Sequence, residues 1–185
     1  MLLRDHQREL AIIGSTEHVD VADIKHIPAK IDTGADSSSI WASHIEVSQD
    51  GVLSFCLFDE GSPFYTGEKL VRKDYKVAVV RNASGHEQIR YRTYLNLKIG
   101  GRQIKVLFNL SDRSRNNFPI LIGRRSISGK FLVDVSKNHT PIPAKNPKSK
   151  LMQQKLRENP YRFHQEYIKK LGGDVDSIKL NKEGA

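Results

Sequence analysis

The residues best suited to chemistry lie in the turn Asp32-Thr33-Gly34-Ala35, which follows an apolar run. A carboxylate held rigidly at the end of a strand can activate a water molecule by taking up its proton. Gly34 lets the backbone approach a second copy of the turn, and the Thr33 hydroxyl can bond across to that copy. We therefore interpret Asp32 as a catalytic carboxylate. The alternative is an ordinary turn in which Asp32 caps the chain.

A second segment, Pro119-Ile120-Leu121-Ile122-Gly123-Arg124, is an apolar strand that ends in Gly-Arg. We expect this strand to pack behind the Asp32 turn. Arg124 would then reach Asp36, four residues after Asp32, as a partly buried ion pair. Ala35, Asp36, Gly123 and Arg124 are thus predicted to support the site. Breaking such a pair on one side costs about 3–5 kcal/mol where the pair is buried.

The elements that must position these residues are mostly β-strands. Short apolar runs broken by Gly, Asp, Asn and Ser extend from about residue 9 to 135, and they predict strands at 24–31, 52–58, 75–80, 89–99, 103–109 and 118–122. Gly100-Gly101 between two such runs predicts a tight hairpin, because the turn needs positive φ. A second hairpin is expected around residues 82–85.

The composition changes after Val135, and we predict two regions, 1–136 and 137–185. The second begins with a proline-containing linker. Asn159-Pro160 then predicts a helix start, with a capping side chain followed by proline at the first helical position. This basic C-terminal extension carries most of the excess positive charge of the chain.

Together these motifs resemble those of retropepsin-like aspartic proteases, and more narrowly those of a bacterial family that has been called ATP-dependent zinc proteases. The resemblance covers about residues 10–136. It rests on Asp32 to Ala35, on Arg81-Asn82-Ala83-Ser84-Gly85, and on Leu121 to Arg124, in the family's order. It implies a mainly β fold, the closed β-barrel of the acid proteases, and an aspartic-type endopeptidase acting on a peptide or protein.

Aspartic proteases use two carboxylates that share one proton, because two like charges about 3 Å apart cannot both ionise. The sequence has one Asp-Thr-Gly turn, and Asp59-Glu60-Gly61 has the wrong middle residue. The resemblance therefore implies a homodimer in which Asp32 of each subunit meets at a two-fold axis.

The hairpin from Val77 to Arg90 occupies the place in the sequence of the flap that covers the site in retropepsins. Its predicted substrate-facing residues are Arg81, Asn82, Ser84, Gly85 and His86. A polar, cationic flap favours an acidic or polar substrate over an apolar one, which we state as a hypothesis.

The sequence offers no support for a metal or a nucleotide cofactor, and we predict neither. The seven histidines lack ligand spacing, and no His-Glu-x-x-His or Gly-x-x-x-x-Gly-Lys-Ser/Thr motif is present. Cys56 lies between apolar neighbours and is predicted to be a core residue.

The net charge of +9 and the pI near 9.7 leave other functions open. A basic partner of ribosomes or nucleic acid is one, but aromatic residues do not interleave with the charges, so we favour a solvated helical tail. A dimeric binding module that no longer cleaves is another. With one cysteine and no apolar run of about 20 residues, we expect a cytoplasmic protein without a membrane partner.

Overall fold

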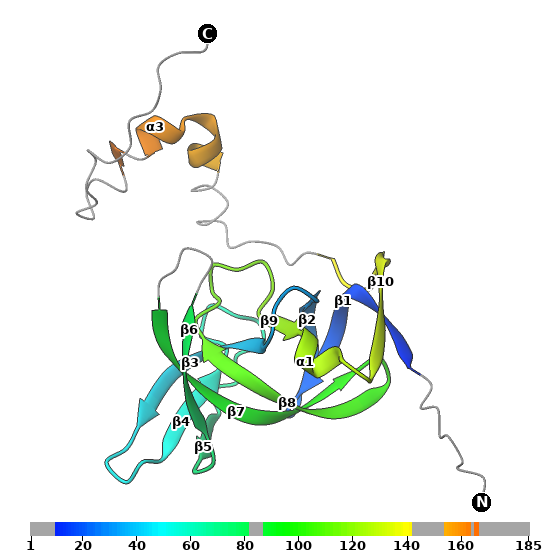
Figure 1. Cartoon of the computed structure of the whole chain (residues 1–185). Coiled ribbons are helices and arrows are strands. Elements are labelled where there is room, and N and C mark those ends of the chain that lie inside the picture. Colours follow the sequence, from blue (N-terminus) through cyan, green and yellow to red (C-terminus); the bar gives the residue numbers. More distant parts are fainter. Residues whose placement is uncertain (1–9, 82–86, 142–153, 164, 167–185) are drawn as a thin grey trace, which may run out of the picture. The chain divides into compact units, whose positions relative to one another are not determined.

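The computed structural model describes residues 10–81, 87–141, 154–163 and 165–166. The chain divides into two compact units, Met1–Pro143 and Ala144–Ala185. Within the described ranges, the first unit contains ten strands and one short helix (Figure 1). They are β1 (Ala11–Val21), β2 (Ile24–Asp32), β3 (Ser38–Val47), β4 (Leu53–Leu57), β5 (Lys69–Arg72), β6 (Lys76–Arg81), β7 (Glu87–Ile99), β8 (Arg102–Ser111), β9 (Ile120–Gly123), α1 (Arg124–Ile127) and β10 (Phe131–Asn138).

Six of the strands close into a barrel. Neighbouring strands follow the order β1-β2-β9-β3-β8-β7, and β7 pairs back onto β1 through Val21 opposite Leu97. The predicted mainly β fold with a closed barrel is therefore confirmed. β10 extends the sheet beside β1, β6 extends it beside β7, and β4 with β5 forms a small sheet that continues from β3.

The position of β9 decides how the barrel is built around the turn after β2. β2 and β3 are consecutive in the sequence, yet β9 lies between them, parallel to β2 and antiparallel to β3 (Figure 1). Residues 33–37 must therefore cross over the end of β9. The prediction that the strand at 118–122 packs behind the Asp32 turn is confirmed.

The inside of the barrel is apolar, as the alternation of the strands predicts. Its fully buried side chains come from strands that are distant in the sequence but adjacent in the barrel. The largest from the barrel strands are Phe108, Ile13, Ile27, Ile40, Leu97, Ile99, Ile120, Ile122 and Val19. Leu53 and Phe55 of β4, and Phe58 just after it, are also fully buried and belong to the same core. Burying a side chain of this size contributes about 1.5–3 kcal/mol, so this core supplies a rigid base for the turn.

The predicted strands at 24–31, 52–58, 75–80, 89–99, 103–109 and 118–122 all occur, with ends shifted by a few residues. The hairpin at Gly100-Gly101 is also present, with φ values of 53° and 74°. The structure adds β1, β3, β5 and β10, which had not been predicted individually. β3 begins with two buried serines, and β1 contains buried Thr16 and Glu17, so polar residues mask their strand pattern.

In the second unit, helix α3 (Pro160–Phe163) begins where predicted. The Asn159 Oδ1 atom accepts a hydrogen bond of 2.9 Å from the backbone N–H of Arg162, which is the expected cap. No helix in the described ranges is long and apolar enough to cross a lipid bilayer.

Candidate active site

The Asp32 carboxylate is held by the backbone of its own turn. Its Oδ1 atom accepts hydrogen bonds from the backbone N–H groups of Gly34, at 3.1 Å, and of Ala35, at 3.2 Å. The Ala35 N–H also lies 3.2 Å from the Asp32 carbonyl oxygen, which closes the turn. These bonds fix the direction of the carboxylate at the end of β2. Asp32 is only partly buried, so the other carboxylate oxygen can meet a second group.

Gly123 lies directly opposite Asp32 in the pairing of β2 with β9. A Cβ atom at this position would lie 2.6 Å from the carbonyl carbon of Ser37 and 2.9 Å from the Ala35 oxygen. The Gly123 N–H donates to Ser38 Oγ at 3.0 Å, and the next residue, Arg124, donates its N–H to Ala35 O at 2.8 Å. Glycine is therefore required here, because the loop crosses directly over the end of β9.

Asp36 and Arg124 form the expected ion pair, and Arg125 Nη2 lies 3.5 Å from the other carboxylate oxygen of Asp36. The Asp36 and Arg124 side chains are 51% and 62% exposed, which is more than the partly buried pair we had expected. Exposed pairs contribute about 0–1 kcal/mol, so the cost of a buried pair does not apply. The Arg125 N–H also donates to the Asp36 carbonyl at 3.3 Å, so α1 is tied to the loop by its backbone as well.

Thr33 projects from the turn and is exposed. No hydrogen bond joins its hydroxyl to another residue in the described ranges. Together with Gly34, which has open space around it apart from the Asp32 carboxylate, it forms a small surface without large side chains.

A layer of serine and asparagine side chains lies beneath the turn, and the sequence motifs had not revealed it. Asn109 Nδ2 donates to Ser37 Oγ and to the Ser38 carbonyl, both at 2.9 Å. Ser38 Oγ, in turn, lies 2.8 Å from Ser126 Oγ. This layer connects β8, β3 and α1. Only the run of three serines after Asp36 could have pointed to it.

Arg113, in the loop between β8 and β9, was not predicted either. Its Nε donates to the Phe118 carbonyl at 3.1 Å, and its Nη1 donates to Ser39 Oγ at 2.8 Å. Burial lowers the pKa of the guanidinium, the charge of Arg90 lowers it further, and the carboxylate of Asp32 acts in the opposite direction. Arg113 is thus a partly buried cation that interacts electrostatically with Asp32.

The predicted flap corresponds to the pair β6–β7, in which Arg81 lies opposite Glu87. Asn82, Ser84, Gly85 and His86 lie outside the described residues, so their predicted contact with substrate stays a prediction. The described arms add an apolar strip: Val77, Val79 and Ile89 are 59%, 65% and 70% exposed.

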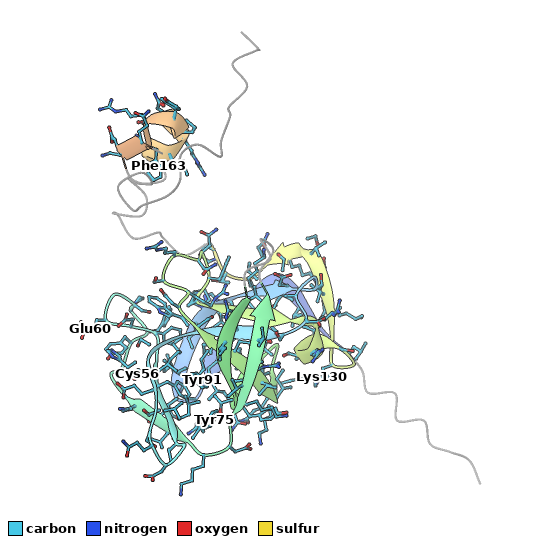
Figure 2. The ribbon with its side chains drawn as sticks, turned by 60° about the vertical axis from the view of Figure 1, so that its left-hand side comes forward. Cys56, Glu60, Tyr75, Tyr91, Lys130 and Phe163 are labelled. Atoms are coloured by element: carbon cyan, nitrogen blue, oxygen red, sulfur yellow. The ribbon has the colours of Figure 1, made fainter. Side chains whose placement is uncertain are left out.

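The pairing of the arms accounts for this strip. Val79 lies opposite Ile89, and Val77 lies opposite Tyr91, so all four side chains share one face. At the base of the arms, Tyr91 packs against Tyr75, with ring centroids 5.8 Å apart (Figure 2). The sequence signal for this strip was the recurrence of apolar residues at every second position in β6 and in the first part of β7.

In the described ranges, no three His, Cys, Asp or Glu side chains come together in a way that could hold a metal ion. Cys56 is buried at 5% exposure, as predicted. A thiol in such a position is inert as a nucleophile.

Comparison with known families agrees with this geometry. Residues 12–144 match the model of the RimB-like family, described as retropepsin-like aspartic endopeptidase RimB. The chain belongs to this family. The matched region contains the Asp32 turn, the β6–β7 pair and the Gly123-Arg124 segment. The resemblance to retropepsin-like proteases is thereby confirmed, whereas the finer expectation, a family called ATP-dependent zinc proteases, does not match the description of the RimB-like family.

Longer relatives match about two thirds of this chain. A probable alpha-L-glutamate ligase from Shewanella pealeana is 31% identical over 133 residues, which cover 69% of this chain and 29% of the relative. One from Desulfotalea psychrophila is 27% identical over 128 residues, covering 66% of this chain and 28% of the relative. The chain thus spans less than a third of the length of these relatives.

A solved structure shares the fold as well. The crystal structure of a Legionella pneumophila protein with unknown function is 27% identical in sequence, with a TM-score of 0.54. The match covers 70% of this chain and 97% of the Legionella protein. The matched part of this chain therefore corresponds to nearly the whole of the Legionella protein.

Proposed function

We propose that this chain is an aspartic endopeptidase that works as a homodimer on acidic peptide segments. The observation that carries the proposal is the Asp32 carboxylate, fixed by two backbone N–H groups at the end of a barrel strand. Two such carboxylates sharing one proton would activate a water molecule and polarise the peptide carbonyl. The match to a family described as retropepsin-like aspartic endopeptidases supports this chemistry.

The homodimer follows from the presence of one Asp-Thr-Gly turn in the sequence. The second carboxylate must come from another copy of the chain, which a two-fold axis at the turn provides. The exposed Thr33 and the small Gly34 support such an approach, because no large side chain of the turn stands in its way.

The proposed substrate is a peptide rich in glutamate. The name of the longer relatives, probable alpha-L-glutamate ligase, connects this type of domain with proteins that handle glutamate. The net charge of +9 favours an acidic partner. Ligation itself is not proposed for this chain, since it spans less than a third of those relatives.

A peptidase assay on a glutamate-rich peptide, run from acidic to neutral pH, tests the proposal. Asp32→Asn should lower the rate by at least about 10²–10⁴-fold, the range for removing an acid–base group, without a change in the circular dichroism spectrum. Asp23→Asn is the matched control, because Asp23 is exposed at the other end of β2. A rate equal in Asp32→Asn and wild type would contradict the assignment of Asp32.

Mixing the two proteins tests the dimer. The comparison is made with wild type at the same total protein concentration. If each active site needs Asp32 from both subunits, an equal mixture of wild type and Asp32→Asn should have about one quarter of that activity after subunit exchange, because only about one quarter of the dimers contain two wild-type subunits. Retention of one half would mean that each subunit cleaves alone.

The assay also separates the competing functions. A binding module that no longer cleaves would bind the peptide without product, and Asp32→Asn would bind equally well. A nucleic-acid partner would instead bind RNA or DNA with an affinity that falls steeply with salt.

A further inference from the structure

We propose that Arg113 binds a carboxylate of the substrate beside the Asp32 turn and thereby sets a preference for acidic peptides. The inference rests on the peptidase function proposed above and assigns its specificity to one side chain.

Asp32 and Ser39 lie on the same, outer face of the barrel. Side chains directly opposite each other on paired strands share a face, as do alternate residues along one strand. Lys30, two residues before Asp32, lies opposite Leu121, and Leu121 lies opposite Ser39. Because Arg113 Nη1 donates to Ser39 Oγ, the guanidinium also lies on this face.

The guanidinium of Arg113 is fixed before any substrate binds. Its bonds to the Phe118 carbonyl and to Ser39 Oγ use two of the five N–H groups that an arginine carries. The rest of the fork can make the paired N–H bonds to a carboxylate that lysine cannot make. A side chain held in this way loses little conformational freedom on binding.

The surroundings of Arg113 favour a polar ligand. Asn109 lies opposite Ser39 on one side and Arg92 on the other, so both continue the same face. Ser39, Asn109 and Arg92 therefore make this face polar, which suits a polar peptide better than an apolar one.

The charges point to an anion. Arg90 is a like charge close enough to disfavour the protonated form of Arg113, and Asp32 is the opposite charge that favours it. A substrate carboxylate bound to Arg113 would meet a positive charge and leave Asp32 available for chemistry. One strand, β9, lies between β2 and β3, so these two strands are about 10 Å apart. An extended peptide covers that distance with two or three residues, so the bound carboxylate would lie two or three residues from the cleaved bond.

Kinetics on a matched pair of peptides test this inference. One peptide carries glutamates on both sides of the cleaved bond, and the other carries glutamines at the same positions. Arg113→Gln should lower kcat/KM for the glutamate peptide by about 10- to 100-fold, mainly through KM, the range for a hydrogen bond to a charged group. The glutamine peptide should change by less than about threefold. Arg115→Gln is the control, since Arg115 is exposed in the same loop.

A charge-reversal variant, Arg113→Glu, tests whether the effect is purely structural. Its kinetics are measured on a peptide that carries lysines in place of the glutamates. A reversal of preference toward lysine supports recognition of charge. An equal loss on both peptides in Arg113→Gln would overturn the inference, because Arg113 would then act on Asp32 or on the loop. Unchanged kinetics would overturn it as well.

A binding assay separates failure of this inference from failure of the peptidase function. A fluorescent oligoglutamate peptide is titrated with Asp32→Asn and with Asp32→Asn/Arg113→Gln. If wild type cleaves nothing, the peptidase function is wrong. Weaker binding by the double variant alone would still support the carboxylate site, whereas equal binding by both variants would overturn it.

Discussion

Asp32 and Gly123 are direct partners in the parallel pairing of β2 with β9. The pairing puts the end of a strand from residues 120–123 against the turn that carries the carboxylate, although the two are distant in the sequence. The loop at 33–37 passes over Gly123 with no room for a side chain. The direction of the Asp32 carboxylate therefore depends on a residue that has no chemistry of its own.

Gly123→Ala should destabilise the fold by about 1–3 kcal/mol or more, the range for overpacking a close contact. The added methyl group would lie 2.6 Å from the Ser37 carbonyl carbon, and the backbone cannot move away easily. Urea unfolding measures this loss, and peptidase activity should fall further than stability alone explains. Gly61→Ala is the control, because nothing lies within 4 Å of a Cβ atom there. Equal midpoints for both variants would contradict the steric argument.

Thr33→Val should weaken the proposed dimer without affecting the folded subunit. The Thr33 hydroxyl has no hydrogen-bond partner in the described part of its own chain, so its loss should affect only the proposed contact to the second subunit. A pair of such bonds at about 1 kcal/mol each predicts a tenfold or greater rise in the dimer dissociation constant. Analytical ultracentrifugation measures it, and Thr33→Ser should restore wild-type behaviour. A lower unfolding midpoint of Thr33→Val with an unchanged dimer dissociation constant would contradict this role.

The sequence predicted the parts of the fold that depend on local pattern. Apolar alternation located six strands, and Gly100-Gly101 located a hairpin. The pairing of the strand before Gly123 with the Asp32 turn was also predictable, because glycine and arginine after an apolar run are informative together. The order of strands in the barrel could not be predicted, because periodicity shows which face of a strand is buried but not which strand lies beside it.

The polar contacts beneath the turn were not predictable for a related reason. Ser38 is only 1% exposed, yet serine in a sequence predicts a turn or a surface. Its burial depends on the Gly123 N–H and on Ser126 Oγ, which only the folded chain brings close. Arg113 is similar, because the bond to Ser39 that holds it spans 74 residues.

Glu17→Ala should lower the free energy of unfolding by about 1–3 kcal/mol. Glu17 is 7% exposed, accepts a 2.6 Å hydrogen bond from the Gly14 N–H and lies 2.7 Å from His139 Nδ1. Removing the carboxylate leaves the Gly14 donor without its partner in a buried position. Chemical denaturation measures the change. Glu46→Ala, which breaks an exposed pair with Lys69, should stay within about 0.5 kcal/mol of wild type.

We expect the Asp134 carboxylate to add to the free energy of unfolding at neutral pH and to lose this contribution in acid. The hydroxyl and the N–H of Ser136 donate to Asp134 Oδ1 at 2.6 and 3.0 Å, and these bonds, with Lys137 nearby, lower the pKa of the carboxyl group from 3.8. Because the pKa is lower in the folded state, the stabilisation is complete above about pH 4 and is lost as the pH falls through the folded pKa. NMR titration of the Asp134 carboxyl carbon should give a value that rises in Ser136→Ala and stays low in Ser136→Thr. The same low value in Ser136→Ala would show that the hydroxyl is not the cause. Because the Asp134 carboxyl group is ionised at neutral pH with or without the Ser136 hydroxyl, the rate of peptide cleavage at neutral pH should be the same in all three proteins.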